Sequence, residues 1–338
     1  MNRGHWRTLS SWLLAAAGIG ILAALAMRVS WSTIAATLRE AAIPWLGASL
    51  VLAIASVSLR AFRLSVLLGW RGTFPQIWRS VCLGYFGSLF LPLGGGEIVK
   101  VAALQRQAGL SLPRAGAALT MDRLFDIATL FTLLVSLLGH GLIQGVRAGP
   151  MLMFAITMAA LIALLLFLLL SGDVLRSRIL VWAEHHPGRH AWVHRFDEIH
   201  DQANALRRPF LLPTLGALQA CIFTMDILAA WCGLLAFPFG HGLPASAPLR
   251  LALFAMIGFG LPLLPGGLGS HQAATILALA PYGIGAAQAL AVSLAGEATH
   301  VAALAGLGLV AIAGSGLNPL RLTRHREVLD SPHPPEIS

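Results

Sequence analysis

Charged side chains are scarce in this sequence, and carboxylates are the scarcer of them. Only 11% of the 338 residues are charged, with 14 Asp and Glu against 23 Lys and Arg, whereas 57% are hydrophobic. A soluble domain needs a far more polar surface. The net charge of +9 would suggest nucleic acid in a soluble chain, but here the arginines lie between apolar runs, where they contact anionic lipids and set topology. The composition therefore predicts a multi-pass membrane protein without a nucleic-acid partner.

Cysteine is rare as well, and several chemical motifs are missing. Cys82, Cys221 and Cys232 all fall in apolar segments without metal-ligand or disulfide spacing, so we expect three buried free thiols. The phosphate-binding pattern G-x-x-x-x-G-K-[ST] is absent, and no nucleophile–base set stands out. These absences favour a protein that is not itself an enzyme and that holds no cofactor and no resident metal.

Six apolar runs are long enough to cross the membrane as helices, because a ~30 Å hydrocarbon core needs about 20 helical residues. They are residues 11–27, 45–68, 115–138, 150–171, 211–236 and 286–314. The first run follows a basic start, as in a cleaved signal peptide, but a chain with further spans usually keeps its first one as an anchor.

Two further apolar stretches, 80–108 and 251–281, are interrupted. Pro92 and three glycines break the first, and two prolines with "GGLG" break the second. Each half is about 12 to 14 residues long, which is too short to span but suits a re-entrant hairpin. We therefore expect two re-entrant hairpins besides the six spans.

The arginines indicate the topology. With the N-terminus in the cytoplasm, 17 arginines, including Arg60 and Arg63, fall on the cytoplasmic side and four, including Arg250, fall outside. The hairpins then enter from opposite faces, so that the units 45–138 and 211–314 form an inverted repeat. A shift of 174 residues supports this by pairing Gly95 with Gly269, Glu97 with His271, Arg123 with Glu297 and Asp126 with His300. The expected fold is an all-α polytopic membrane domain over 1–314, followed by a cytoplasmic tail at 315–338.

The longest polar stretch, 172–210, has a helical apolar stripe over about residues 190–208. This pattern predicts an amphipathic helix in the membrane interface. His186, His190 and His194 are spaced by four and could bind zinc, but they also suit a polar interfacial face interrupted by proline and glycine.

The first unit carries charges at membrane depth. In "LPLGGGEIVK", Gly95 and Gly96 precede Glu97 and Lys100, and the start of a short helix can hold an anion such as a phosphate. The alternative is that the glycines only allow close packing. In "TMDRLFD", Asp122, Arg123 and Asp126 share one helix face, which lines either a head-group site or an ion-pair cluster between helices.

The second unit carries fewer charges. His271 and Gln272 follow its glycine turn, and Glu297 and His300 stand one turn apart in the last span. Asp226, the most isolated carboxylate, either bonds to a neighbouring helix or relays protons. Asp226, His271, Glu297 and His300 are therefore the candidates for proton coupling, whereas His271, Gln272 and Glu297 also join the substrate-binding candidates.

Three segments, "RAFRLSVLLGW", "LPLGGGEIVKVAALQRQAGLSLPRAGAALTMDRLFD" and "LPLLPGGLGSHQAATILALAPYGIGAAQALAVSLAGEATH", resemble the flippase-like membrane domain of lysylphosphatidylglycerol synthases and of many stand-alone bacterial and archaeal proteins. The resemblance covers about 45–314. It implies a multi-pass protein of the bacterial inner membrane that handles lipids, with Gly96, Glu97, Lys100 and Arg123 at the matching motif positions. Gln272 and Glu297 depart from the family, which commonly has Glu and Arg there, so no particular head group is implied.

The resulting functional hypothesis is a lipid flippase that binds an anionic head group between the two hairpins. Because only a short tail follows the last span, we do not expect the chain alone to make lysyl-lipid. An accessory subunit for envelope-lipid or polyprenyl-linked glycan synthesis is one alternative, and a small-solute secondary transporter is another. No ATP-binding motif is present, so a proton gradient or downhill movement would drive transport.

Overall fold

The computed structural model describes residues 29–91, 95–139, 210–260 and 267–314, with the isolated positions Gly20, Met27, Ile156 and Ala159. All regular elements in these ranges are helices. Several predictions fall almost wholly outside the described residues: the spans 11–27 and 150–171, the interfacial helix 190–208, the histidines His186, His190 and His194, and the tail 315–338.

The helices form two units in which a long helix, two short helices and another long helix follow one another. After α2 (Trp31–Arg39), the first unit contains α3 (Ile43–Leu67), α4 (Phe74–Ser88), α5 (Gly95–Ala108) and α6 (Leu112–Gly139). The second contains α10 (Leu211–Leu235), α11 (Ser246–Gly260), α12 (Ser270–Leu279) and α13 (Ala286–Gly314), with short 3-10 turns at Pro238–Gly242 and Ala280–Tyr282. The four predicted spans that fall on described residues are confirmed to within a few residues, and each apolar stretch between them is divided into two short helices as predicted.

Three of the described helices, α3, α10 and α13, are long and apolar enough to cross a membrane. Helix α6 is longer than α3 but carries Asp122, Arg123 and Asp126 near its middle. Large apolar side chains such as Leu212, Trp231 and Leu309 are exposed on the outer faces of these helices. Such surfaces suit lipid rather than water, and the chain is a polytopic membrane protein.

Helices α3 and α10 cross antiparallel at the centre of the molecule. Ala42, directly before α3, and three positions of α3 that follow at steps of seven residues bond to α10 or its C-terminal cap at successive levels. The pairs are Ala42–Ala236, Ser49–Ala229, Ser56–Asp226 and Arg63–Gln219. A spacing of seven returns to the same helix face after two turns, so one face of α3 follows α10 along its length.

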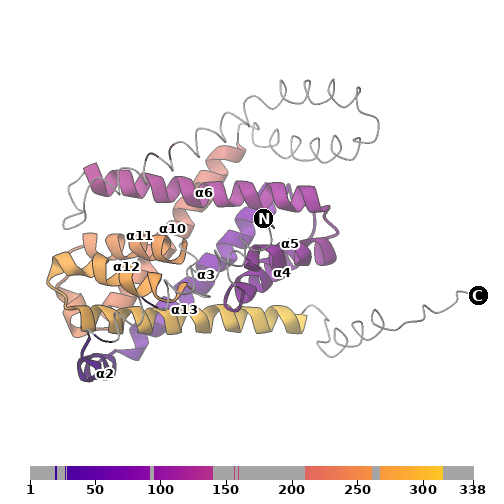
Figure 1. Cartoon of the computed structure of the whole chain (residues 1–338). Helices are drawn as coiled ribbons and strands as arrows, with labels where there is room; N and C mark the ends of the chain where they lie inside the picture. The colour runs from indigo at the N-terminus through magenta and orange to yellow at the C-terminus, as the bar shows by residue number, and fades with distance from the viewer. Residues whose placement is uncertain are drawn as a thin grey trace, which may run out of the picture.

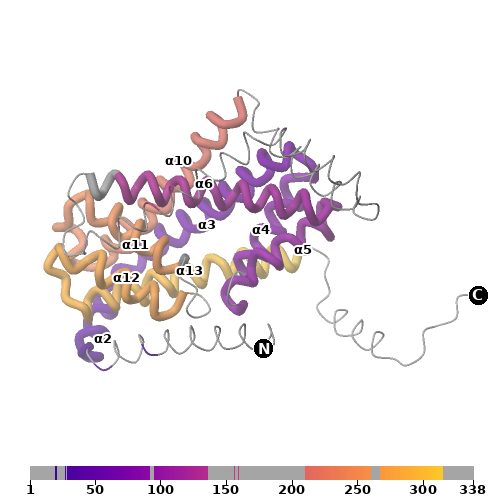
Figure 2. Tube along the Cα trace, turned by 45° about the horizontal axis from the view of Figure 1, so that its top comes forward, coloured from indigo at the N-terminus to yellow at the C-terminus, as the bar shows by residue number. Residues whose placement is uncertain are grey.

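The remaining helices surround this pair. Helices α6 and α13 lie on opposite sides of it and run in opposite directions (Figures 1 and 2). The hairpin of α4 and α5 fills one end of the space between α6 and α13, and the hairpin of α11 and α12 fills the other end (Figure 1). The interrupted ends of both hairpins point towards the middle of the molecule (Figure 1).

Two apolar clusters occupy the two ends of the bundle, and polar residues lie between them. Along α6, cluster residues at 115–119 precede the charges at 122–126, and residues of the other cluster follow at 133–134. Along α13, cluster residues at 289–295 precede Glu297 and His300, and those at 304–311 follow. The polar residues therefore stand at the middle level of both long helices.

Glycine lets the helices of each hairpin approach closely. A Cβ atom on Gly96 would lie 2.5 Å from the carbonyl oxygen of Gly84, and one on Gly258 would lie 2.8 Å from the Cα atom of His271. Both distances are far shorter than a van der Waals contact, so these positions accept no side chain without backbone movement. A packing role for Gly96, one of the two roles expected from sequence, is thus confirmed.

The cysteines differ from expectation. Cys82 is buried and Cys232 is half-buried, but Cys221 is exposed on α10, so the prediction of three buried thiols was wrong for Cys221. A hydrophobic run does not reveal which helix face packs against protein when the other face contacts lipid.

Candidate functional site

Asp126 on α6 is the centre of a network of charged side chains. Its Oδ1 atom accepts hydrogen bonds from Arg60 Nη1 and Arg63 Nη2, both at 3.0 Å, and its Oδ2 atom accepts one from Arg123 Nη1 at 3.2 Å. A single carboxylate thus joins three guanidinium groups. Since Arg60 and Arg63 belong to α3, the network ties α3 to α6 at the middle of the bundle.

Arg63 is fully buried, and its side chain is satisfied on all sides. Its Nε atom donates to Asp122 Oδ1 at 2.8 Å, Nη2 donates to the Asp122 carbonyl oxygen at 3.1 Å, and Nη1 donates to Gln219. The amide of Gln219 in turn donates to Thr129 Oγ1 at 2.6 Å. These bonds extend the network from α3 and α6 to α10.

Asp226 on α10 is also part of this network. Ser56 Oγ donates to its Oδ1 atom at 2.6 Å, and Arg60 Nη2 contacts its Oδ2 atom at 2.7 Å. The interpretation of Asp226 as an isolated carboxylate was therefore wrong. Its arginine partner comes from a helix 166 residues away in sequence, which no local pattern could indicate.

The network continues to the first hairpin through Glu97. The Oε1 atom of Glu97 contacts Lys100 Nζ at 3.1 Å and also accepts a bond from Arg123. Lys100 is buried, and its ammonium group lies 4.9 Å from the centre of the Tyr85 ring. The Arg123 side chain is 42% exposed. Arg123 is thus the most accessible cation of the network.

The charges of this network balance. Glu97, Asp122, Asp126 and Asp226 supply the carboxylates, and Arg60, Arg63, Lys100 and Arg123 supply the cations. Charged side chains at membrane depth need partners of opposite charge, because an unpaired charge there costs several kcal/mol. The expected ion-pair cluster between helices is confirmed, and it links four helices.

A second polar group lies on α12 and α13. Gln272 Nε2 donates to Glu297 Oε2 at 2.5 Å, while Gln272 Oε1 accepts from the Gly269 N–H, also at 2.5 Å. The rings of His271 and Phe259 stack with centres 4.3 Å apart, and the His300 ring lies 5.2 Å from Phe259 on a tilted plane.

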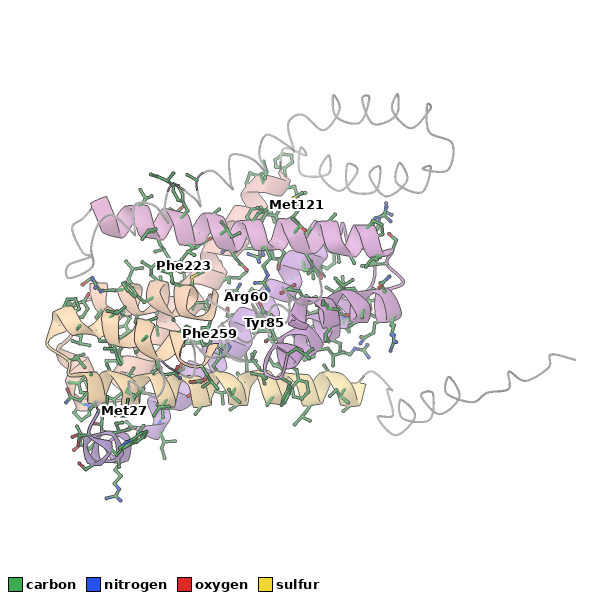
Figure 3. The ribbon with its side chains drawn as sticks, in the orientation of Figure 1. Met27, Arg60, Tyr85, Met121, Phe223 and Phe259 are labelled. Carbon is green, nitrogen blue, oxygen red and sulfur yellow. The ribbon has the colours of Figure 1, made fainter. Side chains whose placement is uncertain are left out.

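The two polar groups approach each other at the centre of the bundle. His300 lies within electrostatic range of both Asp226 and Arg60. Tyr85 lies within the same range of Arg60 and Arg123. Figure 3 places Arg60, Tyr85 and Phe259 in the central part of the molecule, where the hairpins meet the α3–α10 pair.

The structure therefore brings the predicted residues together in two sets. Glu97, Lys100, Asp122, Arg123, Asp126 and Asp226 belong to the ionic network, with Gly95 and Gly96 opening the helix that carries Glu97. His271, Gln272, Glu297 and His300 belong to the second polar group. The sequence did not assign Ser56, Arg60, Arg63 and Gln219 to a site.

Three arginines of the topology count lie within helices and bond to other parts of the bundle. Arg60 and Arg63, counted as cytoplasmic, lie inside α3 and are ion-paired, and Arg250, counted as outside, is buried and donates to the Leu277 carbonyl at 3.2 Å. The one sequence signal was the seven-residue spacing of Ser49, Ser56 and Arg63, which puts polar side chains on one face of an apolar helix.

Comparison with known families gives one match. The model of the family described as "Lysylphosphatidylglycerol synthase TM region" matches residues 11–308. This range contains all the residues of both polar groups. None of the curated proteins compared with the chain matches it. Because the family match covers most of its length, the chain belongs to the lysylphosphatidylglycerol synthase transmembrane-region family.

Proposed function

We propose that the protein moves lipids across the bacterial inner membrane and that the ionic network binds an anionic head group between two re-entrant hairpins. The observation that carries this proposal is Arg123, a half-exposed guanidinium at the end of an otherwise buried, charge-balanced network. Ionisable groups at membrane depth mark substrate and ion pathways in transport proteins. Membership of the family, whose description concerns a lipid-modifying enzyme's membrane region, supports a lipid as the substrate.

We further propose that both termini lie in the cytoplasm, and the helix arrangement supports an inverted repeat. Each packing contact in the first unit has a counterpart in the second: α4 with α5 corresponds to α11 with α12, α5 with α6 to α12 with α13, and α3 with α4 to α10 with α11. Helices α6 and α13 run in opposite directions, as an inversion requires (Figure 1). In transporters with this symmetry, the substrate site lies near the midplane where the interrupted helices meet.

Glu97 suggests how a head group would bind. Lys100 and Arg123 already share one carboxylate oxygen of Glu97, and a phosphate offers the same kind of acceptor with more oxygens. An arriving head group would therefore compete with Glu97 for both cations. Because the network is neutral before binding, a lipid anion that displaced Glu97 would leave this carboxylate to be hydrated or neutralised.

The test is lipid movement in liposomes that contain the purified protein and a panel of head-group-labelled lipids. We expect protein-dependent movement of an anionic lipid, its loss in Arg123→Ala and partial retention in Arg123→Lys, which keeps the charge but loses the bidentate geometry. Arg106→Ala is the matched control, since Arg106 is an exposed arginine of α5.

Other outcomes would replace this proposal. If no lipid crosses faster than in empty liposomes but a lipid or glycan product forms after a soluble enzyme is added, the accessory-subunit function holds instead. Uptake of a soluble solute in preference to every lipid would favour a secondary transporter. Equal lipid movement in wild type and Arg123→Ala would exclude the proposed binding site.

A further inference from the structure

Among the residues that the structure describes, Glu97, Asp122, Asp126 and Asp226 each contact an arginine or lysine. Glu297 is the carboxylate of the described long helices and hairpins that contacts neither, and its side-chain partner is the amide of Gln272. It stands at the middle level of α13, in a helix apolar enough to span the membrane. A carboxylate at that depth must be neutralised by a cation or by a proton.

Gln272 cannot supply the missing charge. Its Oε1 atom is held by the Gly269 N–H, so its amide nitrogen is the atom that faces Glu297. Gly269 has a φ of 84°, a conformation that favours glycine, and it thereby fixes the turn that places Gln272. This arrangement orients one Glu297 oxygen and leaves its other oxygen, Oε1, available.

Two buried hydroxyl groups, one helical turn from Gln272 on α12 and from Glu297 on α13, have no hydrogen-bond partner among the described residues. Thr275 Oγ1 and Ser293 Oγ are both buried and unbonded among the described residues, as is Nδ1 of His271. Many hydroxyls in the described helices donate to the carbonyl four residues earlier, as Thr129 and Thr299 do. Buried hydroxyls without a partner indicate that a ligand or water is needed to satisfy them.

The helix register places these groups together. Helices α12 and α13 pack against each other and are joined by a short turn, so they run antiparallel. Because Gln272 meets Glu297, the residue three positions further on α12, Thr275, faces the residue four positions earlier on α13, Ser293. From this register we expect the two hydroxyl groups to face each other between the helices, one turn from the Glu297 carboxylate.

We propose that Glu297, Thr275 and Ser293 form a site for a monovalent cation, either Na⁺ or a proton carried with ordered water, between α12 and α13. Oxygen atoms from an interrupted helix and its neighbour are the groups that hold coupling ions in inverted-repeat transporters. Only the role of this ion in driving lipid movement rests on the proposed function. Binding of the ion to the protein does not.

Several charged or titratable side chains surround the proposed site. They lie on the elements packed against α13: His271 on α12, Asp226 on α10, Arg60 on α3, Tyr85 and Arg79 on α4, the exposed Arg39 and Glu40 on and beside α2, and His300 on α13 itself. His300 lies one turn after Glu297 on α13 and is in electrostatic range of Asp226. A change of charge at Glu297 would therefore be felt by the network that holds the head group.

The experiment measures ion binding to the full-length protein in nanodiscs, without any lipid transport. Thermal unfolding is compared in NaCl and in choline chloride at equal ionic strength, and infrared difference spectra between two pH values follow the band of a protonated carboxyl group. Glu297→Gln tests the carboxylate, Thr275→Val and Ser293→Ala test the hydroxyls, and Glu40→Gln is the control on an exposed glutamate.

Each result has a distinct meaning. If Na⁺ is the ion, it raises the Tm of the wild type by about 2 °C or more at saturation, and Glu297→Gln abolishes the rise. If a proton is the ion, Na⁺ has no effect and a protonated-carboxyl band disappears in Glu297→Gln. The proposal is overturned if Na⁺ has no effect and the spectrum lacks this band, or if the signal persists in Glu297→Gln. Failure of the lipid assay with a positive ion result would refute only the proposed function.

Discussion

Arg123 on α6 and Glu297 on α13 hold equivalent positions in the two four-helix units, and each bonds to the first turn of the short helix that precedes its own. Arg123 bonds to Glu97 on α5, and Glu297 bonds to Gln272 on α12. The two contacts lie at corresponding places in the two units, but the residue on the long helix is a cation in the first unit and an anion in the second. The first unit therefore presents a cation to the middle of the bundle, whereas the second presents an anion.

Glu97→Gln should strengthen the binding of an anionic head group. The substitution removes the negative charge that Lys100 and Arg123 share, and the network then carries a net charge of about +1. We expect affinity for an anionic lipid to rise by about tenfold, which corresponds to 1.4 kcal/mol. The measurement is fluorescence binding of a head-group-labelled lipid in nanodiscs, with Glu40→Gln as control. A loss of affinity similar to that of Lys100→Ala would show that Glu97 does not compete with the lipid.

Arg63→Met should destabilise the fold strongly. Removal of this buried guanidinium leaves Asp122 and Gln219 without their partner, and breaking a buried ion pair from one side costs about 3–5 kcal/mol. The effect would be measured as a lowered Tm in detergent. Arg71→Met, a substitution of an exposed arginine near the end of α3, should leave the Tm nearly unchanged. Equal Tm values for the two variants would contradict the structural role of the network.

Arg60 and Asp226 should show energetic coupling. Their side chains meet at 2.7 Å, so a double-mutant cycle with Arg60→Gln and Asp226→Asn should give an interaction free energy of about 0.5–3 kcal/mol. The free energies come from the unfolding equilibria of the two single variants and the double variant. Arg79 on α4 provides the control cycle with Asp226, since its bonds are to Pro75 and Gly314. Strict additivity for Arg60 and Asp226 would mean that the pair contributes no specific stabilisation.

Gly96→Ala should loosen the first hairpin. The added Cβ would meet the Gly84 carbonyl, and overpacking of this kind costs about 1–3 kcal/mol. Thermal unfolding would measure the cost. Gly116→Ala is the matched control, because no heavy atom lies within 4 Å of a Cβ built at that glycine of α6. A Gly96→Ala variant as stable as Gly116→Ala would argue against close contact between α4 and α5.

The orientation of the hairpins can be tested with two single cysteines in a background lacking Cys82, Cys221 and Cys232. Ile98 and Leu268 follow the two interruptions and are 72% and 39% exposed. If the hairpins enter from opposite faces, Ile98→Cys should react with a membrane-impermeant maleimide from the cytoplasmic side and Leu268→Cys from outside. Labelling of both from the same side would contradict the inverted repeat.

Sequence reasoning located the long helices and the two interruptions because hydrophobic length and Pro–Gly breaks are local properties. It also selected Glu97, Lys100, Asp122, Arg123 and Asp126, because a charged residue within an apolar run can be recognised from the sequence alone. Only their spatial assembly required the structure.

The errors came from long-range contacts. Arg60 and Arg63 fall inside the predicted span 45–68, which agrees with α3, but the sequence used them only for topology and not as site residues. Their partners Asp126, Asp226 and Gln219 lie on other helices, and helical periodicity shows which face is polar but not which helix that face meets. Glu297 pairs with the amide of Gln272 and not with a basic side chain. This pairing also depends on the packing of α12 against α13.

The four-level attachment of α3 to α10 limits how this molecule can change shape. Bonds at both ends and at the middle of the pair leave these two helices little freedom to separate, so they serve as a fixed spine. Any cycle that admits a lipid first from one leaflet and then from the other has to displace the hairpins, α6 or α13 around that spine. A cross-link between α3 and α10 should then leave transport intact, whereas one between the two hairpins should stop it.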